Sequence, residues 1–213
     1  MTTFENAFWA EHPAARLAGI DEAGRGPLAG PVIAGAVEIP QDALPALAAA
    51  ELDGLTDSKK LTELQREHFF AILTAHPQIK TATGLCTPAE IDRHNILRAT
   101  HLAMSRAASA LPGGAPAHAL VDGLPVRGLP CPSTSIVKGD AKSLLIAAAS
   151  VIAKVTRDRI MTACETEYPG YGFAKHKGYP TPEHLAALRR LGALPIHRRS
   201  FGPVAEIISP GLF

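Results

Sequence analysis

Apolar segments that end abruptly in carboxylates are the feature that most restricts the fold of this chain. The segment 16–22 (RLAGIDE) ends in Asp21 and Glu22, and a Gly/Pro-rich turn, AGRGPLAGP, follows it. A second apolar segment, Val32 to Ile39, then predicts an antiparallel partner strand. His118 to Asp122 (HALVD) is a short apolar run that also ends in a carboxylate, which is typical of a buried strand. The sequence therefore predicts a sheet with acidic residues at its strand ends.

Helix-start signals organise the middle of the chain. Thr62-Glu-Leu-Gln65 has the form of a capping box and predicts a helix to about Leu73. Thr87-Pro88-Ala89-Glu90 combines an N-cap threonine, a proline at the first helical position and a glutamate three residues after the cap. We expect helical structure from there to about Leu111, with Asn95 as the place where it could break.

The last third of the sequence predicts a short strand and then mainly helices. The expected elements are a strand at Thr134 to Val137, a long Ala-, Leu- and Ile-rich helix from Lys142 to about Glu167, and a last clear helix that starts at Thr181 and stops at Gly192. This order predicts one α/β domain spanning 1–213. Its α/β core would cover about 16–165 and a C-terminal helical lobe about 166–213.

Composition excludes some classes of protein. A hydrophobic content of 46% and a charged content of 19% are ordinary for a soluble globular chain. No stretch reaches the roughly 18 consecutive apolar residues of a membrane span, and the acidic N-terminus does not resemble a secretory signal. Three cysteines, Cys86, Cys131 and Cys164, are too far apart for a C-x-x-C metal site. Their odd number favours free thiols in the reducing cytoplasm.

Charge is distributed unevenly along the chain. Residues 134–213 hold 11 Lys/Arg against 6 Asp/Glu, whereas residues 1–133 hold 10 against 14. A basic C-terminal part beside acidic strand ends suits a polyanion held over a metal site. A solvated surface would account for the same numbers, so the pattern needs support from the acidic residues themselves.

Four carboxylates are candidates for one metal site: Asp21, Glu22, Asp122 and Asp140. Carboxylates packed together repel one another unless cations neutralise them. Oxygen ligands without His or Cys favour Mg²⁺ or Mn²⁺ over zinc. Two such ions about 4 Å apart can hold both the attacking and the leaving oxygen of a phosphodiester. The alternative is that the four residues are turn residues and helix caps.

Several motifs together resemble the ribonuclease HII family. They are, in chain order, Gly19-Ile-Asp-Glu-Ala-Gly-Arg-Gly-Pro27, Asp57-Ser-Lys-Lys-Leu61, Val121-Asp-Gly123, Lys138-Gly-Asp140, Ala147-Ala-Ala-Ser-Val-Ile-Ala-Lys-Val-Thr-Arg-Asp158, Tyr171-Gly-Phe-Ala-Lys-His-Lys-Gly-Tyr179 and His197-Arg-Arg-Ser-Phe201. The resemblance extends from residue 16 to about residue 203. Arg25, where the type III enzymes usually have lysine, favours type II. The implied fold is a ribonuclease H-like mixed sheet flanked by helices, with a C-terminal helical lobe.

The resemblance also implies roles for individual residues. All four carboxylates would be catalytic metal ligands, with Asp21 touching both ions. The loop Gly24-Arg25-Gly26 would contact the ribonucleotide through its backbone and sense the 2′-hydroxyl, which suits glycine's lack of a side chain. Tyr179 would stack on the sugar of the following deoxynucleotide. The alternative for Tyr179 is a half-buried aromatic residue that only packs.

Smaller roles fall on the Asp57-Ser-Lys segment and on the C-terminus. Ser58 and Lys59 are candidates for phosphate contacts, while Asp57 could cap a turn. The C-terminal segment Ser209-Pro-Gly-Leu-Phe213 could dock on a replication clamp, a question that the sequence leaves open. A monomer would suffice for all of these roles.

The resemblance implies an endonuclease. It would hydrolyse the RNA strand of RNA/DNA hybrids and cut on the 5′ side of single ribonucleotides in duplex DNA. With two Mg²⁺ or Mn²⁺ ions, the expected products are 3′-hydroxyl and 5′-phosphate ends. A nucleic-acid-binding module without activity is the runner-up, which loss of one carboxylate would have favoured.

Other motifs offer competing interpretations. Gly24-x-Gly26-x-x-Ala29 fits a dinucleotide-binding fingerprint, but that motif should open a helix and here a β-branched segment follows. Asp158 competes with Asp140 as a ligand. It lies about 18 residues further along the chain, about 27 Å on a straight helix, so an ion pair with Lys154 is its expected role. His176 and His197 are expected to contact phosphate or form structural hydrogen bonds.

Overall fold

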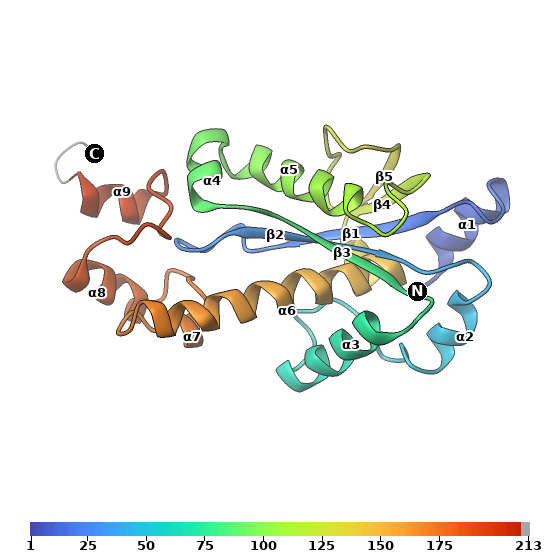
Figure 1. Ribbon diagram of the computed structural model, residues 1–213, viewed down its shortest axis with the longest axis horizontal. Helices are drawn as coiled ribbons and strands as arrows, with labels where there is room; N and C mark the ends of the chain where they lie inside the picture. Colours follow the sequence, from blue (N-terminus) through green and yellow to red (C-terminus); the bar gives the residue numbers. More distant parts are fainter. Residues whose placement is uncertain (210–213) are drawn as a thin grey trace.

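Residues 1–209 are described by a computed structural model in which a five-stranded sheet lies between two layers of helices (Figure 1). The strands are β1 (Leu17–Ala23), β2 (Val32–Glu38), β3 (Lys80–Cys86), β4 (His118–Asp122) and β5 (Ser133–Ile136). The helices are α1 (Thr3–Glu11), α2 (Leu44–Ala49), α3 (Glu63–Ala75), α4 (Pro88–His94), α5 (Ile96–Ser109), the 3₁₀ turn η1 (Gly139–Ala141), α6 (Leu144–Glu167), α7 (Phe173–His176), α8 (Pro182–Leu191) and α9 (Gly202–Ile208).

The strand order β3-β2-β1-β4-β5 makes β1 the centre of a mixed sheet. β1 pairs antiparallel with β2, so that Asp21 lies opposite Gly35. It pairs parallel with β4, where Ile20 lies opposite Val121. Parallel neighbours end at the same edge of a sheet. The carboxylates that end β1 and β4 are therefore brought side by side.

Each face of the sheet has its own apolar core. α6 crosses the face that carries Leu17, Val37 and Leu120, with α3 packed against α6, whereas α4 and α5 cover the opposite face (Figure 1). Alternate residues of a strand point to opposite faces, so β1 and β2 supply both cores. This burial on both faces explains why the two strands read as almost continuously apolar.

Glycines allow α6 to lie directly on the strands. A Cβ placed on Gly19 would be 2.1 Å from the backbone carbon of Leu145, and one on Gly35 would be 2.4 Å from the backbone oxygen of Ala149. Neither distance is sterically possible, because the obstacle is main chain rather than a flexible side chain. The helix backbone therefore sits as close to β1 and β2 as the absence of side chains allows.

The N-terminus of α6 is capped by a residue from the first helix. Ser143 is the N-cap, and its hydroxyl donates to Oε1 of Glu5 at 2.6 Å. The backbone N–H of Leu145 donates to the same oxygen at 3.1 Å. Glu5 is fully buried, and its second oxygen has no hydrogen-bond partner among the described residues. A carboxylate at this position satisfies free N–H groups and suits the positive end of the helix dipole.

The helices α7 and α8 lie beside the far end of α6, and α9 lies beyond α8 on the side of α4 (Figure 1). Between α8 and α9 the chain passes the loop that joins β1 to β2, where His197 forms an isolated β-bridge with Ala29. No helix within residues 1–209 has the length and apolar content needed to cross a membrane.

Local signals in the sequence were reliable where they involve capping. Both capping boxes, at Thr62 and Thr87, are present, and Asn95 separates α4 from α5 as expected. Six elements were not anticipated: α1, α2, β3, η1, α7 and α9. The helix at Thr181 is therefore not the last one, because α9 follows it. α6 begins at Leu144 rather than Lys142, because η1 precedes it.

The close approach of α6 to β1 can be tested with one methyl group. We expect Gly19→Ala to lower the free energy of unfolding by about 1–3 kcal/mol or more, the usual cost of overpacking a core. Gly202→Ala is the matched control, because no atom lies within 4 Å of the added methyl. Urea unfolding of both variants measures the difference. Equal stability of Gly19→Ala and the parent would show that the interface between α6 and β1 can accommodate a methyl group.

Candidate active site

Three of the four carboxylates expected at the metal site form one cluster. Oxygens of Asp21, Asp122 and Asp140 all lie within 4.8 Å of one another. The side chains come from the ends of β1 and β4 and from η1. Asp21 and Asp140 are only 6% and 8% exposed. Such a cluster of buried acids, far apart in sequence, is more than a set of separate turn caps.

The segment Lys138-Gly139-Asp140 is held against β4 by its backbone. The N–H of Gly139 donates to Oδ1 of Asp122 at 2.7 Å. Lys138 adopts the left-handed conformation, with φ of 57°, and this turns the chain into η1. A Cβ on Gly139 would be 2.6 Å from the Ile146 side chain. Asp140 is thus delivered to the cluster by a turn that is tied to Asp122.

Electrostatics at the cluster favour a bound cation. Burial raises the pKa of Asp21 well above its usual value, and the neighbouring Glu22 and Asp122 raise it further. Burial, then Asp122 and Asp57, raise the pKa of Asp140. Each charge therefore destabilises the others. The three carboxylates offer oxygen ligands, which fit a hard divalent cation that would neutralise this repulsion.

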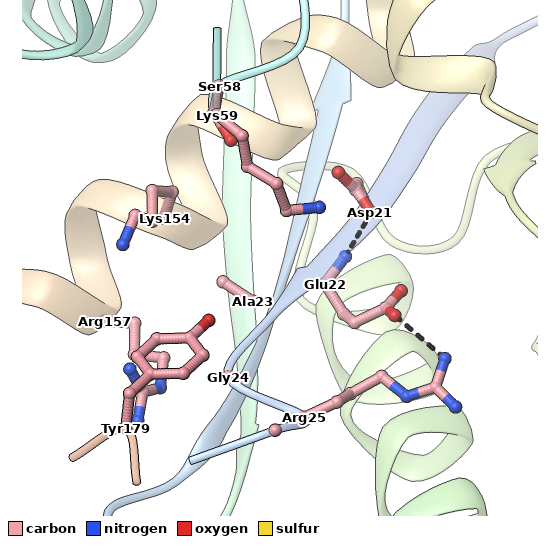
Figure 2. Close-up of a pocket in the computed structure, with 11 residues that line it drawn as sticks. Asp21, Glu22, Ala23, Gly24, Arg25, Ser58, Lys59, Lys154, Arg157 and Tyr179 are labelled. Atoms are coloured by element: carbon pink, nitrogen blue, oxygen red, sulfur yellow. Dashed lines mark hydrogen bonds and ion pairs between the residues drawn. The ribbon is translucent and has the colours of Figure 1, made fainter. Parts of the chain in front are cut away.

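Glu22 points to the other face of β1. Alternation puts Asp21 on the α6 face together with Gly19, and Glu22 on the α5 face. There Glu22 lines a hollow that Asp122 of the cluster also borders. Its carboxylate pairs with Arg25 at 3.2 Å (Figure 2). Burial raises the pKa of Glu22, and Arg25 opposes that rise. The role of Glu22 as a metal ligand stays a prediction, and it would compete with this ion pair.

A cavity of about 410 Å³ opens beside the cluster. Its lining combines the end of β1 with the Gly/Pro-rich turn, α6 and the loop before α8 (Figure 2). The lining residues are Asp21, Glu22, Ala23, Gly24, Arg25, Gly26, Ser58, Lys59, Lys154, Arg157 and Tyr179. Every residue predicted from the sequence to bind substrate therefore borders one space.

The Asp57-Ser-Lys segment closes the cavity from the α6 side. The amine of Lys59 points toward Asp21 (Figure 2), and the acids Asp21, Asp57 and Asp140 raise its pKa against the effect of burial. Asp57 accepts from the N–H of Lys59 at 2.9 Å, so it caps the turn as expected. It also adds negative charge beside Asp140, which the sequence did not reveal. Ser58 is buried, and its N–H donates to the hydroxyl of Ser150.

Two buried arginines that the sequence reasoning missed support the Gly24-Arg25-Gly26 loop. Arg157 of α6 donates to backbone oxygens of Ala29, Pro31 and Lys177, and Arg198 donates to those of Gly24, Arg25 and Gly30. A Cβ on Gly24, where φ is +94°, would be 2.0 Å from Nε of Arg157. Arg157 lies in a charged stretch of α6, beside Lys154, Asp158 and Arg159, so the sequence did not single it out as buried.

Tyr179 stands at the rim of the cavity with 41% of its surface exposed. Its ring lies 5.9 Å from the guanidinium carbon of Arg157, and a Cβ on Gly26 would be 3.7 Å from the ring. The ring and the glycine loop thus lie next to each other in the lining of one cavity (Figure 2). Such a position allows contact with a ligand, and a half-buried aromatic residue that only packs would show the same exposure.

Other candidates fall outside the cluster. Asp158 pairs with Lys154 at 2.9 Å, as predicted. His176 and His197 are buried and form structural hydrogen bonds, which is one of the two roles expected of them. The Gly24-x-Gly26 segment leads into β2 rather than a helix, so the chain lacks the helix N-terminus that a dinucleotide fingerprint requires there.

Comparison with known proteins identifies the family to which the chain belongs. The family model for ribonuclease HII matches residues 18–204. The chain belongs to the ribonuclease HII family. It is therefore an endoribonuclease. The Asp21–Asp122–Asp140 cluster is consistent with a divalent-cation site of such an enzyme.

Curated and solved ribonucleases HII agree with this assignment. The chain is 53% identical to ribonuclease HII of Geobacillus kaustophilus over 193 residues, covering 91% of this chain and 70% of that protein. Ribonuclease H2 of Pyrococcus horikoshii OT3 has a similar structure, with a TM-score of 0.73 at 29% identity over 90% of this chain and 96% of the other. The ribonuclease HII in a complex with PCNA from Archaeoglobus fulgidus gives 0.65 at 25% identity, covering 88% and 95%.

The repulsion within the cluster predicts that its carboxylates lower the stability of this ribonuclease HII when no cation is bound. Without divalent cations, Asp21→Asn should stabilise the protein at neutral pH, because it removes a buried charge that its neighbours oppose and keeps the acceptor for the N–H of Glu22. The expected gain is about 0.5–2 kcal/mol, or about 2–4 °C per kcal/mol in the melting temperature. Thermal unfolding in EDTA measures it. A less stable Asp21→Asn protein would contradict this account.

Proposed function

We propose that this ribonuclease HII cuts the RNA strand of RNA/DNA hybrids and cuts duplex DNA on the 5′ side of a single embedded ribonucleotide. The proposal rests above all on the juxtaposition of the Asp21–Asp122–Asp140 cluster with the cavity that Gly26 and Tyr179 help to line. A phosphodiester over the cluster would have its 3′-side sugar in that cavity. The expected products carry 3′-hydroxyl and 5′-phosphate ends.

Two Mg²⁺ or Mn²⁺ ions are the proposed cofactors. When bound, such ions orient and activate water and stabilise the leaving oxygen. Asp21, Asp122 and Asp140 would hold them, with Glu22 joining once Arg25 turns to the substrate. Because the bound ions would activate water, the reaction would need no protein nucleophile. The described residues that line the cavity include carboxylates but no cysteine or histidine.

Substrate selection is proposed to rest on two neighbouring sugars. The backbone of Gly24-Arg25-Gly26 would contact the 2′-hydroxyl of the ribonucleotide, because glycines let main chain approach closely. The Tyr179 ring would pack on the next sugar, where a deoxyribose leaves room for it. Lys59 and Ser58 would contact the phosphate. Lys59 keeps its charge there because the surrounding acids raise its pKa.

The proposal extends to partners and location. The similar Archaeoglobus fulgidus protein forms a complex with PCNA, and we propose that the C-terminal Ser209–Phe213 segment contacts a replication clamp. Residues 210–213 of that segment lie outside the described part of the chain. Deleting them should weaken clamp binding without changing cleavage. The three cysteines are free, as suits a cytoplasmic protein.

The first expected outcome concerns the reaction itself. A duplex with one embedded ribonucleotide should be cut on its 5′ side, and an all-DNA duplex should remain intact. Asp140→Asn should lower the rate by orders of magnitude, because losing a ligand charge misplaces the cations. Asp158→Asn is the matched control and should keep a rate within about twofold, since its ion pair contributes under about 1 kcal/mol. Activity that survives EDTA, or equal cutting of both duplexes, would overturn the proposal.

Tyr179 gives the second expected outcome. Tyr179→Ala should lose about 10-fold or more on a single embedded ribonucleotide, because a stacked ring contributes about 1–3 kcal/mol. Tyr179→Phe keeps the ring and should lose less. Rates on a long RNA/DNA hybrid provide the comparison, and cation affinity should stay the same in both variants. If Tyr179→Ala cuts both substrates as the parent does, the residue only packs.

A further inference from the structure

A chain of hydrogen bonds through two buried histidines ends on the backbone of Tyr179. The N–H of Leu194 donates to Nδ1 of His197 at 2.9 Å, so the proton of His197 is on Nε2. That nitrogen lies 3.1 Å from Nε2 of His184. Nδ1 of His184 lies 2.9 Å from the carbonyl oxygen of Tyr179 and must donate to it. With both rings neutral, every ring nitrogen has a partner.

The surroundings keep these rings neutral. His184 and His197 are 0% and 1% exposed. Burial lowers the pKa of both, that of His197 to about 4. A third ring, His176, stacks on His184 at 4.5 Å, and its Nδ1 accepts from the N–H of Gly178 at 3.1 Å. The main chain at residues 178–179 is therefore held from two sides.

The residue after His197 holds the other substrate-sensing element. Arg198 is fully buried and donates to the carbonyl oxygens of Gly24 and Arg25 at 2.5 and 2.9 Å. Its own N–H donates to the carbonyl of Leu28 at 2.8 Å. No described carboxylate forms a salt bridge with it. A guanidinium that donates to several carbonyls fixes the course of a loop rather than balancing a charge.

We propose that His197 and Arg198, with His184, are positioning residues that set the distance between the glycine loop and Tyr179, and so the selectivity for a ribonucleotide followed by DNA. Adjacent sugars on one strand are joined by a single phosphodiester link, which limits the distance between them. A shift of about 1 Å between the two elements would cost one of the contacts. This inference rests on the proposed roles of the Gly24-Arg25-Gly26 loop and Tyr179.

Substituting a histidine by asparagine or glutamine can remove one chosen hydrogen bond from this chain of hydrogen bonds. An asparagine amide reaches the position of Nδ1 in histidine, and a glutamine amide reaches that of Nε2. At His184 the bond to Tyr179 uses Nδ1, so His184→Asn should keep it and His184→Gln should lose it. At His197 the bond to His184 uses Nε2, so His197→Gln should keep the chain and His197→Asn should break it.

The experiment measures the cleavage rate of each variant on a single-ribonucleotide duplex and on a long RNA/DNA hybrid, with cations saturating. His184→Gln and His197→Asn should lower the ratio of the rate on the single-ribonucleotide duplex to the rate on the long hybrid about 10-fold. His184→Asn and His197→Gln should keep it within about threefold of the parent. Residues that only stabilise the fold would not give this crossed pattern. Arg198→Lys, which cannot donate to all the carbonyls, should slow both substrates.

Controls separate the possible failures. Melting temperatures identify any variant that does not fold, and each histidine pair is a complete test if the other pair unfolds. Tyr179→Ala is measured in parallel. If it lowers the ratio and the four histidine variants do not, the positioning inference is wrong while the role of Tyr179 stands. If Tyr179→Ala leaves the ratio unchanged, the proposed role of Tyr179 fails and the inference fails with it.

Discussion

The contact of α6 with β1 and β2, backbone against backbone at Gly19 and Gly35, is the constraint on which the rest of the structure depends. It brings the start of α6, and therefore η1 with Asp140, against the ends of β1 and β4. It also places Arg157 of the same helix under the glycine loop. One helix thus joins the acidic cluster at its beginning to the Gly24-Arg25-Gly26 loop further along. A methyl group between helix and strand would disturb both at once.

The acidic cluster shows a local conflict that serves function. Asp21 and Asp140 are buried next to other carboxylates, and burial and neighbours both raise their pKa. Nothing in packing requires acids there, because apolar residues would fill the same strand ends at lower cost. Their retention makes sense when cations neutralise them. The same conflict makes the cluster detectable without any knowledge of the family.

Sequence reasoning succeeded where a short segment carries the whole signal. Capping residues such as Thr62 and Thr87 act within one turn, so their helices could be predicted. β3 was missed because it is an edge strand, with Thr81, Thr83 and half-exposed neighbours that show little alternation in hydrophobicity. α1 and α9 were missed because each is short and anchored by one buried apolar residue, Trp9 and Val204 respectively.

Within the site, three carboxylates were predicted correctly as one cluster. The separation of Glu22 onto the α5 face could have been read from strand alternation, because adjacent strand residues always diverge. By contrast, the nearness of Asp57 to Asp140 and the burial of Arg198 depend on contacts between distant segments. No local pattern encodes them. Cation binding by these residues, and the parts assigned to the glycine loop and Tyr179, stay predictions.

The cap that Glu5 gives to α6 has a consequence for where the folding unit begins. The residues shared with the family model start at residue 18, yet α1 supplies the carboxylate that satisfies the first turn of the longest helix. A fragment cut at the family boundary would leave the N–H of Leu145 and the hydroxyl of Ser143 without that acceptor, immediately after Asp140. Removing the residues that precede the family match would thus loosen the turn that carries Asp140.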